Sequence, residues 1–172
     1  MSITNNIDFS RIKKILVIQF QPFGDVFLCS ATFEAIKKRF PHAELWYLTK
    51  SPYQVTIKDH PFLEGIITFP KTTGLTYVID RLKLFRKIYL EKFDLVIDQQ
   101  NNPGSQQLVF FSRATYRVGY DHGQYAFVFN VKVKRGERRY SPSMRFDLLK
   151  CLGIDEEKWQ FYYQISDQSR AR

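Results

Sequence analysis

The feature that most constrains the fold is an apolar run followed directly by a helical pattern. Residues 14–20, KILVIQF, are apolar over the length of a strand, which is typical of a central strand in a parallel sheet. Apolar residues then recur at steps of three and four up to Pro41, a helix breaker, so they share one helical face. They are Val26, Cys29, Phe33, Ile36 and Phe40. This pairing predicts a strand–helix unit.

The rest of the chain repeats the alternation of strand and helix. Further strands are predicted at 43–49, 64–70, 93–100 and 116–120, with a final strand or linker at 159–165. Helices are predicted at 51–61, within 71–92, at 106–114 and at 141–154. The alternation predicts an α/β fold: a Rossmann-like open, mostly parallel sheet with helices on both faces and residues 14–20 near its centre.

Two helices carry more detailed predictions. In the helix at 51–61 we expect Ser51 to be the N-cap and Pro52 to hold the first helical position. In the helix within 71–92 the apolar spacing predicts a buried stripe. It consists of Ile79, Leu82, Phe85 and either Ile88 or Tyr89.

The net charge of the chain indicates which kinds of partner it could bind. The 172 residues, enough for one domain, carry 26 Lys and Arg against 17 Asp and Glu, a net charge of +9. This favours an anionic partner, whether nucleic acid, an anionic membrane face, a lipid headgroup or an acidic small molecule; the alternative is a solvated basic surface. No apolar run is long enough to span a bilayer, and the N-terminus lacks the apolar core of a signal peptide, so we expect a cytoplasmic protein.

The sequence lacks the motifs of several common catalytic and binding sites. There is no GxGxxG, GxxxxGK[ST] or GxSxG motif, which argues against dinucleotide, P-loop and hydrolase sites. The two cysteines and three histidines lack metal-ligand spacing, so we expect neither metal nor cofactor. The segment 129–145 is strongly basic but has few aromatic residues and no RNA-binding motif, which argues against nucleic acid. Its cations are Lys132, Lys134, Arg135, Arg138, Arg139 and Arg145.

Two loops are predicted at the carboxyl ends of strands, where α/β sheets bind ligands. In the first, QPFGD, Phe23 and Gly24 precede Asp25; in the second, QQNNPGS, the candidates for substrate binding are Gln99 and Asn101. Asp25 has two interpretations. It caps the following helix or sits in its first turn, or it is a general base that takes a proton from a sugar hydroxyl.

The stretch ILVIQFQPFGDVFLCSATFEAIKKRFPHAELWYLT resembles the N-terminal signature of the family-nine glycosyltransferases, the ADP-heptose–lipopolysaccharide heptosyltransferases. Their pattern is a strand, a short loop ending in Gly-Asp, a helix ending in a basic run plus Phe-Pro, and a second strand. The resemblance continues through FDLVIDQQ, YRVGY and FDLLKCLGI, and so covers about residues 14–154.

The resemblance implies half of a GT-B enzyme, in which two Rossmann-like domains face a cleft. The N-terminal domain holds the acceptor and the C-terminal domain the nucleotide-sugar donor. The implied reaction is an inverting, metal-independent transfer of heptose to the lipopolysaccharide inner core. Asp25 falls on the family's catalytic aspartate. Because the inner core is anionic and lies at the membrane, the basic surplus suits both this acceptor and peripheral membrane association.

Four cations are further candidates for binding the acceptor, each with a plain surface charge as its alternative. They are Lys71, Arg113, Arg117 and Arg145. The sequence departs from the family at Gln19, where a basic residue is common, and at Ala31, where a proline is usual.

The resemblance also predicts how the chain is divided. Residues 1–13 are expected to be an N-terminal extension, 14–158 the acceptor-side domain, and 159–172 a final strand or the start of a linker to a second domain that this chain lacks. We expect such a chain to be inactive alone. The rival interpretation is a non-catalytic basic α/β domain that binds an anionic glycan, a lipid headgroup or nucleic acid.

Overall fold

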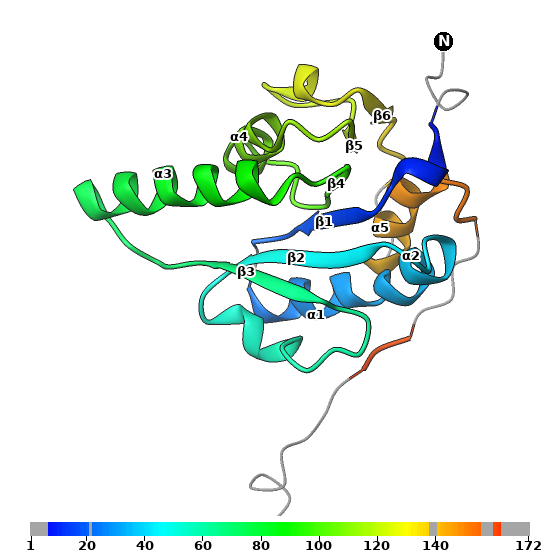
Figure 1. Ribbon diagram of the computed structural model, residues 1–172, viewed down its shortest axis with the longest axis horizontal. Helices are drawn as coiled ribbons and strands as arrows, with labels where there is room; N and C mark the ends of the chain where they lie inside the picture. The colour runs from blue at the N-terminus through cyan, green and yellow to red at the C-terminus, as the bar shows by residue number, and fades with distance from the viewer. Residues whose placement is uncertain (1–6, 21, 138–140, 156–159, 163–172) are drawn as a thin grey trace, which may run out of the picture.

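The computed structural model describes residues 7–20, 22–137, 141–155 and 160–162 (Figure 1). Within them lies a six-stranded sheet with the order β3-β2-β1-β4-β5-β6, and each neighbouring pair is parallel. The strands are β1 (Lys14–Ile18), β2 (Glu44–Lys50), β3 (Gly65–Phe69), β4 (Leu95–Asp98), β5 (Tyr116–Tyr120) and β6 (Val131–Val133). The predicted parallel sheet with β1 near its centre is confirmed.

Helices cover both faces of the sheet, as predicted. The α-helices are α1 (Phe23–Ser30), α2 (Phe33–Arg39), α3 (Gly74–Glu91), α4 (Pro103–Ser112) and α5 (Ser141–Lys150). Short 3₁₀ helices are η2 (Phe9–Arg11), η3 (Tyr53–Thr56) and η4 (Ala126–Val128). In Figure 1, α3 and α4 lie on one side of the sheet, and α1, α2 and α5 lie on the other.

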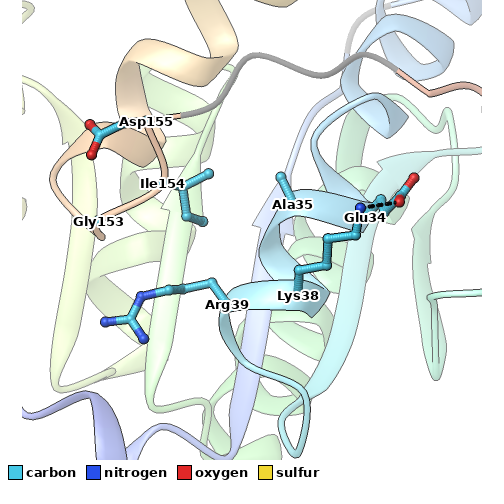
Figure 2. A pocket seen from close by; sticks show the side chains of 7 residues that line it. All are labelled: Glu34, Ala35, Lys38, Arg39, Gly153, Ile154 and Asp155. Carbon is cyan, nitrogen blue, oxygen red and sulfur yellow. Dashed lines mark ion pairs between the residues drawn. The ribbon is translucent and has the colours of Figure 1, made fainter.

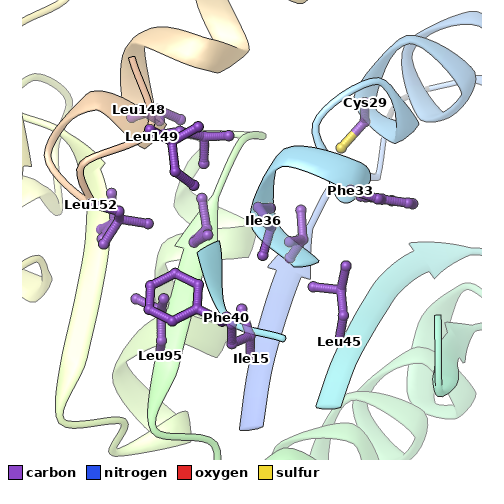
Figure 3. Close-up of a cluster of buried hydrophobic side chains, with 14 of the residues drawn as sticks. Ile15, Cys29, Phe33, Ile36, Phe40, Leu45, Leu95, Leu148, Leu149 and Leu152 are labelled. Carbon is purple, nitrogen blue, oxygen red and sulfur yellow. The ribbon is translucent and has the colours of Figure 1, made fainter. Parts of the chain in front are cut away.

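The core consists of two layers divided by β1. Because successive side chains of a strand point to opposite faces, Ile15 and Val17 pack with α1, α2 and α5, whereas Leu16 and Ile18 pack with α3 and α4. Figure 3 shows the first layer. A strand buried on both faces is apolar along most of its length, and that is why ILVI within KILVIQF indicated a central strand.

The helix predicted from residue 26 to Phe40 is two helices, with a break at Ala31 and Thr32. The Thr32 hydroxyl and backbone N–H both donate to the carbonyl of Cys29, at 2.8 and 3.1 Å. This local bond competes with the regular helical ladder. The predicted apolar face is nevertheless correct, since all five of its residues are buried.

The buried stripe predicted for α3 is wrong for most of its residues. Ile79, Leu82 and Tyr89 are exposed, and Phe85 is half-buried. Of the predicted residues Ile88 is buried, and the helix also buries Arg81 and Leu84, which the spacing did not single out. The Arg81 guanidinium donates to the carbonyl of Gly104 in α4, a contact that holds this side of α3 inward. Apolar residues occur on both sides of this helix, so periodicity alone could not choose between them.

Other boundaries also differ from prediction. Within residues 51–61, where a helix was predicted, only the 3₁₀ helix η3 (Tyr53–Thr56) forms; its N-cap is Pro52, so Ser51 is not the N-cap. The strand β6 was missed because it is three residues long and lies within the basic segment. Residues 160–162 are not in a strand, and 163–165 lie outside the described residues. No helix in the described ranges has the length and apolarity needed to cross a membrane.

Candidate functional site

Asp25 lies in the first turn of α1, the helix that follows β1 in the chain. The N-cap of α1 is Pro22, which offers no capping side chain, and the Asp25 backbone N–H donates to the Pro22 carbonyl at 2.9 Å. Asp25 is therefore not the cap of this helix. The positive end of the helix dipole still favours its carboxylate.

The carboxylate of Asp25 is held by a buried arginine from a distant helix. Arg145 of α5 donates from Nη2 to Asp25 Oδ1 at 2.9 Å; its side chain is 8% exposed, whereas that of Asp25 is 40% exposed. Arg145 Nε is also buried and has no partner among the described residues. The Arg145 guanidinium thus fixes one oxygen of the Asp25 carboxylate, while the carboxylate stays accessible to solvent.

A polar network beneath Asp25 joins α1 to β4. The Cys29 thiol donates to Gln99 Oε1 at 2.8 Å, and Gln99 Nε2 donates to the Thr32 hydroxyl at 3.2 Å. Burial raises the pKa of the Cys29 thiol to about 11, so it stays protonated and is no nucleophile. Gln99 is itself buried and occupied by these partners, which gives it a structural role in the loop.

The loop after β4 is organised by a second aspartate, Asp98. Its Oδ1 accepts the backbone N–H groups of Gln100 and Asn101, each at 3.0 Å, and its Oδ2 accepts the Ser105 hydroxyl at 2.8 Å. Burial raises the pKa of Asp98 to about 6. Asp98 therefore builds the turn into α4 and is closed to solvent.

Asn101 connects that loop to the end of β5. Its amide nitrogen lies 3.1 Å from His122 Nε2, and its Oδ1 accepts a bond from Gln106 Nε2 at 3.2 Å. Arg135 Nη1 lies 3.3 Å from the same His122 nitrogen. The sequence analysis missed His122. It lies two residues after Tyr120, the last residue of β5, so the rule that singled out the other two loops would have found it.

The remaining candidates are dispersed. Phe23 is 45% exposed and packs edge-on against Tyr53, at 5.0 Å between ring centroids. A Cβ at Gly24 would meet no atom within 4 Å, so this glycine borders open space. Lys71 is exposed just after β3, at the edge of the sheet.

Two of the predicted binding arginines lie away from the carboxyl edge of the sheet. Arg113 follows the C-terminus of α4, with its guanidinium 5.8 Å from the Tyr89 ring centroid. Arg117, near the start of β5, donates to the carbonyls of Val128 and Ala114 at 2.7 and 2.6 Å. The first therefore belongs to the α3–α4 surface, and the second is a structural residue.

A hollow on the molecule lies apart from these residues. Figure 2 shows it between α2 and the turn after α5. Its lining consists of Glu34, Ala35, Lys38, Arg39, Gly153, Ile154 and Asp155. No candidate residue lines it. In the described part of the chain, no group of three or more His, Cys, Asp or Glu side chains could hold a metal ion.

Comparison with solved structures defines the class of fold. The chain is similar to a family 9 glycosyl transferase from Veillonella parvula, with a TM-score of 0.82 and 21% identity over 92% of this chain and 47% of that one. The E. coli heptosyltransferase WaaC, solved with ADP-2-deoxy-2-fluoro heptose, gives a TM-score of 0.72 at 15% identity, over 88% and 51%. E. coli ADP-heptose lps heptosyltransferase II gives 0.68 at 16%, over 92% and 48%.

These structures confirm, at the level of fold, the family resemblance seen in the sequence. The chain has the Rossmann-like α/β fold found in family-nine glycosyltransferases and heptosyltransferases, and it spans about half the length of each. No family model and no curated protein matches the sequence.

Proposed function

We propose that this chain is the acceptor-side domain of a heptosyltransferase-like glycosyltransferase of GT-B architecture, with Asp25 as its general base. The observation that carries the proposal is the Asp25 carboxylate, which is solvent-open at the carboxyl end of the central strand and fixed by buried Arg145. The donor would be a nucleotide-sugar, in line with the E. coli WaaC structures solved with ADP and with ADP-2-deoxy-2-fluoro heptose. The acceptor would be the lipopolysaccharide inner core.

The chemistry suits a carboxylate in this position. As the acceptor hydroxyl attacks the anomeric carbon, its proton passes to Asp25, and the bond from that carbon to the diphosphate breaks with its electron pair on the leaving group. Attack from the face opposite the diphosphate inverts the anomeric configuration. The Arg145 guanidinium holds one oxygen of the base and so orients the carboxylate.

Anionic groups of the acceptor need cations near the carboxyl ends of the strands, on the side of the sheet where Asp25 lies. Arg145 is already paired with Asp25, so it acts as a positioning residue for the base. Exposed Lys71 after β3, and exposed Arg135 after β6 beside Asn101 and His122, are the cations we assign to the acceptor. Phe23 and Gly24 border the open space in front of Asp25.

A second candidate function uses the same edge without catalysis. A basic α/β domain could bind an anionic glycan at Lys71 and Arg135, with Asp25 serving only to neutralise the buried charge of Arg145. The Asp25–Arg145 ion pair favours this alternative, because Asp25 is the carboxylate that pairs with a guanidinium whose side chain is only 8% exposed. The two functions differ in whether Asp25 contributes to turnover.

The acceptor assignment is tested by calorimetry with inner-core oligosaccharide and the 172-residue chain. We expect binding that weakens steeply as salt rises, because exposed charges are screened within about 8 Å at physiological ionic strength. The double variant Lys71→Gln/Arg135→Gln should weaken it, whereas the matched control Lys58→Gln/Lys92→Gln, which also removes two exposed lysines, should not. Binding that is absent, or indifferent to salt, would contradict the assignment.

The donor should not bind this chain tightly by itself. In a two-domain transferase, orientation of donor against acceptor contributes on the order of 7–11 kcal/mol to barrier lowering, and the proposal houses the donor in the other domain. Calorimetry with ADP-heptose and the 172-residue chain is therefore expected to show no tight complex. Micromolar affinity would place the donor site within these residues and overturn the division of roles.

A further inference from the structure

The outward side of α3 is an apolar stripe that no described residue covers. Its apolar members recur at helical spacing and are all exposed, with Leu75 76% and Leu82 60% exposed. They are Leu75, Val78, Ile79, Leu82, Tyr89 and Leu90. Because they lie opposite the buried residues Leu84 and Ile88, this stripe contributes nothing to the core.

Every exposed charge on this side of α3 is positive. Lys83, Arg86 and Lys87 are exposed, and within the described ranges none has a recorded ion pair with a carboxylate. The two acidic residues of the helix are already engaged: Asp80 accepts a bond from the Thr72 hydroxyl at 3.0 Å, and Glu91 pairs with Lys14. We call the six apolar residues together with these three cations the α3 outer face.

The α3 outer face continues onto α4. Phe85 and Phe111 stack with centroids 4.3 Å apart, Phe110 beside them is 58% exposed, and Arg113 lies over Tyr89. A shallow hollow lies where the two helices meet, lined by three aromatic rings and by the cations Arg86 and Arg113. An anionic headgroup could enter this hollow while the apolar side chains beside it contact acyl chains.

The mixture of apolar residues and cations decides between a lipid and a protein partner. The central parts of protein interfaces are depleted of lysine, and burying Arg86 within the stripe would cost several kcal/mol without a paired carboxylate. A helix that lies in a membrane surface has this composition instead: Leu and aromatic side chains enter the acyl boundary while Lys and Arg extend to anionic headgroups.

We propose that the α3 outer face docks this protein on an anionic lipid bilayer, with α3 lying in the plane of the interface. The surface lies on the α3–α4 face of the sheet, whereas α1, which carries Asp25 in its first turn, covers the other face (Figure 1). Docking therefore does not depend on the role assigned to Asp25, and it would present the protein to any substrate that resides in the same membrane.

Co-flotation with lipid vesicles tests the docking face, and the vesicles contain no lipopolysaccharide, so acceptor binding cannot contribute. The 172-residue chain should float with phosphatidylglycerol–phosphatidylethanolamine vesicles and not with phosphatidylcholine vesicles. Each cation near an anionic surface contributes about fivefold to partitioning. The triple variant Lys83→Gln/Arg86→Gln/Lys87→Gln should therefore partition about 100-fold more weakly at low salt.

Two further variants locate the effect. The control Lys58→Gln/Lys132→Gln/Lys134→Gln removes the same charge from exposed lysines outside the α3 outer face and should lose no more than a few-fold. Leu75→Ser/Leu82→Ser keeps every charge and should lose binding too, because apolar insertion is absent. Since all these side chains are exposed, melting temperatures should stay near that of the unaltered chain.

Three outcomes would overturn the proposal. One is an unaltered chain that does not float with anionic vesicles, in which case a polypeptide covers the face. Another is an equal loss in both charge triples, which would mean that net charge alone drives binding. The third is a Leu75→Ser/Leu82→Ser variant that binds as well as the unaltered chain.

Discussion

Two aspartates at the ends of adjacent strands are held in opposite ways. Asp98 ends β4, is fully buried, and accepts three hydrogen bonds from its own loop. Asp25 follows β1, is 40% exposed at its side chain, and is held by a single guanidinium from the far end of the sequence. The Asp98 carboxylate stabilises a turn through all of its bonds, whereas the Asp25 carboxylate is held in place and stays accessible to solvent.

The contrast shows that the role of an acidic residue near a strand end can be inferred only when its hydrogen-bond partners are known. Local donors two, three and seven residues ahead make Asp98 part of the backbone architecture. The partner of Asp25 lies 120 residues away, so the fold must be complete before Asp25 is oriented. Accessibility together with long-range positioning is what a general base requires.

The largest difference should appear in stability. Asp98→Ala leaves two part-buried N–H groups without their acceptor, at about 1–3 kcal/mol each, whereas the Ser105 hydroxyl can still donate to the Asn102 carbonyl. We therefore expect a loss of at least about 2 kcal/mol in urea unfolding. Asp98→Asn keeps an acceptor and should lose less. Asp25→Asn should lose below about 1 kcal/mol. Similar losses for Asp98→Ala and Asp25→Asn would remove the distinction between the two carboxylates.

The pH dependence of stability should separate Asp98 from the rest of the chain. Burial raises the pKa of Asp98 from 3.8 to about 6, so between about pH 4 and 6 the folded state keeps a proton that the unfolded chain has lost. Its contribution to stability is therefore present below pH 4 and is lost as pH rises through 6. About two pKa units correspond to up to about 3 kcal/mol.

The measurement is the difference in unfolding free energy between wild type and Asp98→Asn at pH 4 and pH 7. Wild type should lose stability relative to the variant on going to pH 7. Burial lowers the pKa of His60 to about 4, which acts in the opposite direction, but both proteins carry His60 and its effect cancels. A difference that does not change with pH would show that Asp98 does not titrate as described.

The smallest effect should be the coupling between Asp25 and Arg145. Because Asp25 is partly exposed, water screens the pair, and a double-mutant cycle of Asp25→Asn with Arg145→Met should give about 1 kcal/mol or less. Thermal and urea unfolding of the four proteins measure it. A coupling of several kcal/mol would mean that Asp25 is chiefly a structural counter-ion, as the non-catalytic alternative holds.

Much of the fold could be predicted from sequence because burial on both faces gives a central strand a nearly continuous apolar run. KILVIQF and FDLVIDQQ were found in this way. The orientation of α3 could not be predicted, since Arg81 bonds to a carbonyl that only the folded α4 supplies. The three-residue β6 was missed because so short a strand has too few positions to show a pattern.

For the candidate site, the sequence identified Asp25 and its loop, but it did not predict which side chains surround Asp25. That Asp25 does not cap α1, and that Arg145 lies beneath it, depend on how α5 packs against α1. Gln99 looked like a binding residue because it follows β4, yet its amide is used internally. Position at a strand end identifies candidates, and only tertiary packing separates the accessible ones from the structural ones.

The central claim is that Asp25 is the general base. The most direct test is the turnover of the Asp25→Asn variant of the full-length protein. Transfer is measured at saturating ADP-heptose and inner-core acceptor, beside a melting curve and the control Asp59→Asn, an exposed aspartate paired with Lys58. The account predicts a folded variant with normal donor affinity and a kcat lower by about 10²- to 10⁴-fold, with no change for Asp59→Asn. A stable Asp25→Asn protein with near-normal kcat would contradict it.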